Sequence, residues 1–175
     1  MDAATKRVPA SVPALFLAGL QAGMVAAFWM LIWLGISAMW MQHSFWSPAN
    51  VMATVLHGGR AIQPGFGSAT LSGDALYLAL YSLLGAGFAL LVRQRLTGWG
   101  TLLASVLYSL VWYWFWFRFL ALRAMPLVWL LHPEHSTQFG HVIFGAILAR
   151  FGDYLPRRKK VEVPVLEMVE GHESD

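Results

Sequence analysis

Long apolar stretches, separated by short polar segments, run through most of the chain. From Val8 to Gly59 there are 52 residues without a single Asp, Glu, Lys or Arg. An α-helix of about 20 predominantly apolar residues crosses the hydrocarbon core of a bilayer. The pattern therefore predicts four membrane-spanning helices, at residues 12–41, 75–92, 99–117 and 137–154.

Polar and charged residues at the ends of these stretches set the expected helix boundaries. Ser72 or Asp74 is the expected N-cap of the second span, and Arg93 follows its last turn. Residues 61–72 are rich in glycine and serine and are predicted to form the loop before it. Arg150 lies near the end of the fourth span, where its long side chain can reach the interface, so it does not exclude this crossing.

Two further apolar segments are too short to span a bilayer. Ser47, with Pro48 at the first helical position, begins a predicted helix that runs to His57 and ends before a glycine pair. Residues 124–131 form a similar short segment after the third span. Both are expected to lie in the membrane interface. The predicted fold class is all-α: a polytopic membrane protein with a four-helix transmembrane bundle and short interfacial helices on its outer side.

Composition separates this chain from soluble proteins. Apolar residues make up 58% of its 175 residues and charged residues 12%, whereas a typical globular chain is roughly 45–50% apolar and about 25% charged. A soluble fold of this size leaves much of its chain on the surface and cannot hide the uncharged stretch. These numbers exclude a soluble monomer, a disordered chain and a conventional nucleic-acid binder. The expected organisation is a cytoplasmic N-terminus (1–11), a four-span membrane domain (12–155) and a flexible cytoplasmic tail (156–175).

The twelve Lys and Arg residues predict the orientation, because they concentrate on the cytoplasmic side of membrane proteins. With the N-terminus inside, nine lie on the inner side and three on the outer side, so both termini are expected in the cytoplasm. The four basic residues of the tail are also expected to bind anionic lipid headgroups. The inner residues are Lys6, Arg7, Arg93, Arg95, Arg150, Arg157, Arg158, Lys159 and Lys160, and the outer residues are Arg60, Arg118 and Arg123.

Small residues mark the expected helix contacts. In lipid there is little hydrophobic drive between helices, so small side chains that let backbones approach closely take its place. Gly19 and Gly23 form such a pair in the first span. Gly145, Ala149 and Gly152 share one face of the fourth span at helical spacing. The pattern favours a compact bundle.

The histidines are the one group of side chains in the sequence that could bind a metal or a cofactor. Imidazole is a ligand for haem and for transition metals, although a closed zinc site needs four ligands. His141 shares a helix face with Gly145 and is predicted to point into the bundle, where an ionisable residue is a functional-site candidate. The alternative is an imidazole that bonds a neighbouring helix, for example at Tyr108 or Ser109. The candidate ligands on the predicted outer side are His43, His57, His132, His135 and His141.

The sequence contains no catalytic motif, so no catalytic residue is assigned. There is no HExxH, no GxSxG and no phosphate-binding glycine loop. A non-enzymatic accessory or scaffold subunit, packed beside another membrane protein or a second copy of itself, is the first functional hypothesis. A haem- or metal-binding redox protein and a small transporter or channel are the alternatives.

The segment GHVIFGAILA, residues 140–149, resembles the final helix of small uncharacterised bacterial inner-membrane proteins of the YagU type. Their closing helix carries a histidine, then an aromatic–glycine pair and small residues. The resemblance covers these ten residues and the four-span layout. It implies a protein of the bacterial inner membrane whose family has no established chemistry, and it draws attention to His141 and Gly145.

Reporter fusions test the predicted orientation. A reporter inserted at Gly67 is expected to report the outer side, and one placed after Asp175 the cytoplasm, because nine of twelve basic residues favour this arrangement. The measurement is the activity of compartment-specific reporters in whole cells. A cytoplasmic signal from the Gly67 fusion would overturn the orientation.

Overall fold

The computed structural model of the chain describes residues 10–93 and 95–156. Every regular element in these ranges is helical, which confirms the predicted all-α class. Three helices are long and apolar enough to cross a membrane, which is compatible with an integral membrane protein. They are α1 (Val12–Trp40), α3 (Ser68–Val92) and the continuous helix Trp99–Ala124.

The third of these helices extends beyond its predicted end at residue 117. α4 (Trp99–Phe115) passes without a break into the π-helical turn η2 (Trp116–Ala121) and then into the short α5 (Leu122–Ala124). The helix therefore does not end at residue 117, because the Arg118 side chain is exposed and its charge does not require the helix to end.

α3 begins at Ser68, seven residues before its predicted start. The Gly67 N–H donates a hydrogen bond to Oγ1 of Thr70 (3.0 Å), which satisfies an amide that the helix itself leaves free. The Thr70 hydroxyl in turn donates to Oδ1 of Asn50 on a neighbouring helix (2.7 Å). The loop prediction for residues 61–72 is therefore too long, because local composition does not reveal this tertiary bond.

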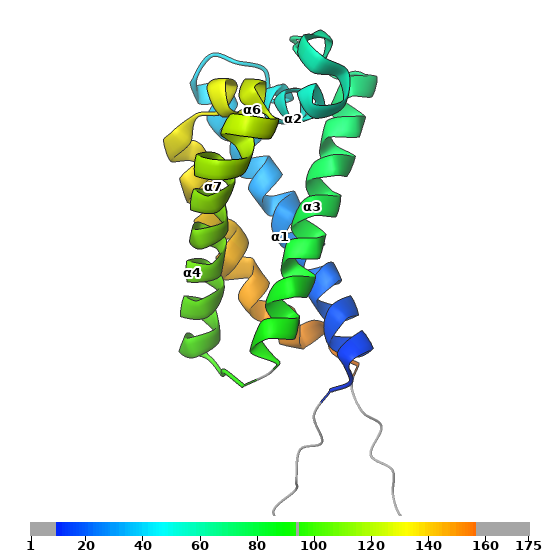
Figure 1. Ribbon diagram of the computed structural model, residues 1–175, viewed down its shortest axis with the longest axis vertical. Coiled ribbons are helices and arrows are strands. Elements are labelled where there is room, and N and C mark those ends of the chain that lie inside the picture. Colours follow the sequence, from blue (N-terminus) through cyan, green and yellow to red (C-terminus); the bar gives the residue numbers. More distant parts are fainter. Residues whose placement is uncertain (1–9, 94, 157–175) are drawn as a thin grey trace, which may run out of the picture.

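Two short helices cover one end of the bundle (Figure 1). α2 (Ser47–His57) has the predicted bounds and leads into η1 (Gly58–Ala61), where Gly58 has a φ of 59° that favours glycine. α6 (Pro126–Leu131) is the second short helix. The position of both helices relative to a bilayer remains a prediction.

α7 (Glu134–Leu148) occupies the place of the predicted fourth span. Its 15 residues are fewer than the roughly 20 that an α-helical crossing needs. It continues into the 3₁₀-helix η3 (Ala149–Tyr154). The fourth crossing is therefore not confirmed by the length of the α-helix and stays a prediction.

α1 holds the bundle together. It packs against α3 on one side and α7 on another, while α4 packs chiefly against α7. The described ends, Ala10 and Pro156, lie at the end of the molecule opposite α2 and α6 (Figure 1). The largest fully buried apolar side chains are Phe88, Phe144, Met30, Leu34 and Leu148.

Glycines bring the backbones of α1 and α3 into contact. A Cβ atom placed on Gly19 would lie 2.6 Å from the Gly85 carbonyl oxygen, and one on Gly85 would lie 2.6 Å from the Gly23 Cα. No side chain fits at these distances, so the two helices can approach this closely only with glycine at these positions. Gly19 and Gly23, the pair expected to mediate packing, thus lie at the α1–α3 contact.

Replacing Gly85 by alanine tests this contact. Gly85→Ala is expected to lower the free energy of unfolding by about 1–3 kcal/mol, the usual cost of overpacking, because the new methyl group would meet α1 backbone. The measurement is reversible unfolding in an uncharged detergent. Gly100→Ala is the matched control, since its Cβ would have 3.9 Å to the nearest atom. Equal destabilisation by both changes would contradict the proposed role of the contact.

Candidate functional site

His141 lies at the centre of a buried polar cluster between α3, α4 and α7. Its side chain has no exposed surface. Nδ1 is 2.8 Å from the Thr137 carbonyl oxygen and Nε2 is 2.9 Å from the Tyr81 hydroxyl. A carbonyl oxygen only accepts, so Nδ1 carries the proton. In the neutral ring Nε2 then accepts a hydrogen bond from the Tyr81 hydroxyl, so that both nitrogens are engaged.

α4 contacts the same residue from the other side. The Ser109 hydroxyl donates to the His141 carbonyl oxygen (2.7 Å). The Tyr113 ring packs against the imidazole, with 5.1 Å between ring centroids. Tyr108 and Ser109 were the expected partners of the imidazole, and neither bonds it. Ser109 bonds the backbone of His141, and the Tyr108 hydroxyl donates to the Leu84 carbonyl (3.1 Å). The imidazole bonds Tyr81 instead, a residue that the sequence analysis did not single out.

Tyr77 adds a second phenol to the cluster. Its ring stacks on Tyr81 with centroids 4.5 Å apart, as residues four positions apart on one helix face allow. The Tyr77 hydroxyl is buried and has no hydrogen-bond partner within the described ranges. It lines a cavity of about 10 Å³, whose other polar walls include His132 and Thr137. The spacing of four residues between Tyr77 and Tyr81 is the feature of the sequence that could have predicted this pair.

His132 separates this inner cavity from a larger one near α2. The outer cavity has a volume of about 160 Å³ and is lined by His43 and Ser47 together with apolar side chains. The His132 ring stacks on Phe117, with centroids 6.0 Å apart and planes 10° apart. Burial lowers the pKa of His132 to about 4, so this imidazole is neutral at pH 7.

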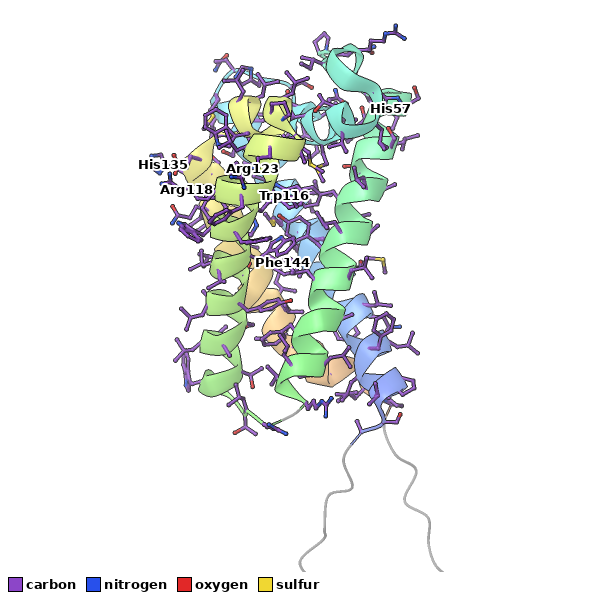
Figure 2. The ribbon with its side chains drawn as sticks, viewed as in Figure 1. His57, Trp116, Arg118, Arg123, His135 and Phe144 are labelled. Atoms are coloured by element: carbon purple, nitrogen blue, oxygen red, sulfur yellow. The ribbon has the colours of Figure 1, made fainter. Side chains whose placement is uncertain are left out.

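The remaining two candidate ligands lie apart from the cluster. His57 and His135 are both exposed and lie on opposite sides of the molecule (Figure 2). His57 Nε2 is 2.9 Å from the Ser72 hydroxyl. His132 precedes α7 in extended conformation, so it does not share a helix face with His135. Residues 10–93 and 95–156 bring together no group of three His, Asp or Glu side chains that could hold a metal.

The predicted packing residues of the last helix divide into two groups. A Cβ on Gly145 would lie 2.6 Å from the Val106 Cα, so this glycine lies at the contact of α7 with α4. Ala149 is partly buried, whereas Gly152 is exposed and has no neighbouring atom within 4 Å of a built Cβ. The three residues do not share one face because η3 has three residues per turn rather than the 3.6 of an α-helix. The predicted headgroup-binding cluster Arg157–Lys160 lies outside the described residues.

Large apolar side chains fill the bundle on the other side of His141. Phe144, one turn along α7, is fully buried in the interior (Figure 2). Phe88 and Phe151 pack edge to face behind it, with centroids 5.7 Å apart. The polar cluster therefore adjoins the cavities near α2 and ends against an apolar core.

No family model, no curated protein and no solved structure matches this chain. The likeness of residues 140–149 to YagU-type proteins accordingly remains a prediction. The interpretation of the site rests on its geometry.

Two tyrosine substitutions test the role of the cluster. Tyr81→Phe is expected to lower the free energy of unfolding by about 1–3 kcal/mol, because it leaves Nε2 of the buried His141 without its donor. Tyr77→Phe is the matched control and is expected to change stability by less, since its hydroxyl has no partner in the described part of the chain. Unfolding in detergent measures both, and a larger loss for Tyr77→Phe would contradict this assignment.

Proposed function

We propose that this chain is a four-span protein of the bacterial inner membrane, with both termini in the cytoplasm, that acts as a non-enzymatic accessory or scaffold subunit. The observation that carries the proposal is the one-sided packing of α4. In the most apolar stretch of its helix 28% of the residues are buried, against 44% in α1 and 39% in α3. This helix offers a full face to another membrane protein.

The length of the last helical segment supports the fourth crossing. α7 and η3 together run from Glu134 to Tyr154 without interruption. At about 1.5 Å per α-helical and about 2.0 Å per 3₁₀ residue, they extend about 35 Å, which exceeds the roughly 30 Å hydrocarbon core. The two described chain ends also lie at the same end of the molecule, as an even number of crossings requires.

The two faces of α4 differ in chemistry. The face toward α7 carries the buried residues Thr101, Ser105, Ser109 and Tyr113. The opposite face is a continuous apolar stripe three or four residues apart, which suits a second transmembrane helix. This stripe consists of Leu103, Leu107, Val111 and Trp114, each more than half exposed.

The state of the buried cluster supports a non-enzymatic role. A general base or metal ligand must be reached by its substrate or ion. The His141 side chain has no exposed surface, and its two nitrogens bond Tyr81 and the Thr137 carbonyl. The cluster thereby fastens α3 to α7.

Site-specific photocrosslinking tests the docking face. The photoreactive residue p-benzoylphenylalanine replaces Leu107 on α4 or, as the control, Leu83 on α3; the two leucines are 61% and 58% exposed. In intact membranes the Leu107 variant is expected to yield a discrete protein adduct, because that face contacts the partner subunit or a second copy. Mass spectrometry identifies the adduct.

The control position distinguishes a docking face from general exposure to lipid. Leu83 is expected to yield only lipid adducts. The same protein band at equal yield from both positions, or no protein adduct from Leu107, would contradict the proposal.

A further inference from the structure

An apolar groove with one carboxylate lies where α1, α2 and α3 meet. It has a volume of about 190 Å³ and is partly open. Asp74 is the one ionisable residue in its lining. The principal apolar walls are Phe28, Leu31, Phe45, Trp46 and Leu78.

Close contacts hold the aromatic wall of the groove in position. The Phe45 ring lies directly on the backbone of Gly35, where a Cβ would overlap the ring. Trp46 packs edge to face between Phe45 and Phe66, at centroid distances of 5.1 and 4.9 Å. These contacts fix the position of the two rings that form this wall.

A second close contact places Asp74 in the groove. Its neighbour Gly73 lies so close to α2 that a Cβ would overlap the Ala49 carbonyl oxygen. α2 thus lies against α3 one residue before Asp74. Because α3 starts at Ser68, Asp74 lies in the second turn of a helix rather than at its N-cap.

Asp74 has no bonded partner to balance its charge. Within the described ranges its carboxylate makes neither an ion pair nor a side-chain hydrogen bond, and no Lys or Arg lines the groove. Asp74 is partly exposed at this groove, and a carboxylate beside apolar walls without a partner is costly. A cation is the complementary occupant.

We propose that this groove is a binding site for a small apolar ammonium compound. The ammonium group pairs with the carboxylate of Asp74 and lies near the faces of Phe45 and Trp46, since aromatic rings attract cations through their quadrupole. The hydrocarbon body fills the space between Phe28 and Leu78. This site is separate from the α4 face and from the histidine cluster. The binding proposal therefore does not depend on the proposed role as an accessory subunit.

The dimensions and walls of the groove favour a free amine over a lipid. About 190 Å³ accommodates a single ring with an ammonium group. A lipid with an ammonium headgroup also carries a phosphate, and the lining offers no cation to receive it. The occupant is therefore a free organic cation with an aromatic or short alkyl body.

Equilibrium binding of benzyltrimethylammonium tests the proposal. The full chain is studied in dodecyl maltoside, which carries no charge and no amine. Asp74→Asn, which preserves shape and removes the charge, is expected to weaken binding at least tenfold. Glu134→Gln removes an exposed carboxylate from α7 and is expected to leave binding within twofold of the wild type. Unchanged binding by Asp74→Asn, or equal weakening by both variants, would overturn the proposal.

Two measurements on the unmodified chain keep the test decisive if a variant fails to fold. Neopentylbenzene, the uncharged carbon isostere of the probe, is expected to compete at least tenfold more weakly, and equal competition would refute recognition of charge. Phosphatidylethanolamine is expected not to displace the probe at equal concentration. Displacement by this lipid would overturn the assignment to a free amine.

Discussion

The backbone contact between α1 and α3 determines the position of the other elements in the described bundle. In lipid the hydrophobic effect drives little association between helices, so dispersion contacts at close range take over. Gly19, Gly23 and Gly85 permit that range. With α3 held on one side of α1, α7 packs on another, and α4 reaches the bundle chiefly through α7. The peripheral position of α4 follows from this order, and so does the exposure of its apolar stripe.

Buried polar pairs then select one register among the packings that glycines allow. The hydroxyls of Ser37 and Ser136 bond each other, and the Trp33 indole N–H donates to the Ser136 carbonyl (2.9 Å), which joins α1 to α7. Tyr81 and His141 join α3 to α7 in the same way. An unpaired polar group in an apolar interior is costly, so a slip of any of these helices would be penalised at several points together.

His141 and Asp74 both differ in the structure from the roles that their local sequence indicates. A histidine among small residues in an apolar helix is a plausible ligand, yet the tertiary structure uses both of its nitrogens for helix contacts. An aspartate before an apolar run is a plausible N-cap, yet the bond between Thr70 and Asn50 starts the helix earlier and moves Asp74 inside it. The candidate ligand-binding group of the chain is thus the Asp74 carboxylate rather than the His141 imidazole.

The sequence by itself determined the all-α class, the presence of three of the four predicted long apolar helices and the bounds of α2, because hydropathy and proline or glycine at helix ends are local properties. Only the tertiary structure decided that α3 starts at Ser68, that the third helix continues past Arg118, and which side chain bonds the His141 imidazole. These outcomes depend on partners far along the chain, such as Asn50 for Thr70 and Tyr81 for His141. Hydrogen bonds of this kind act between helices, and the spacing of residues within one helix does not contain them.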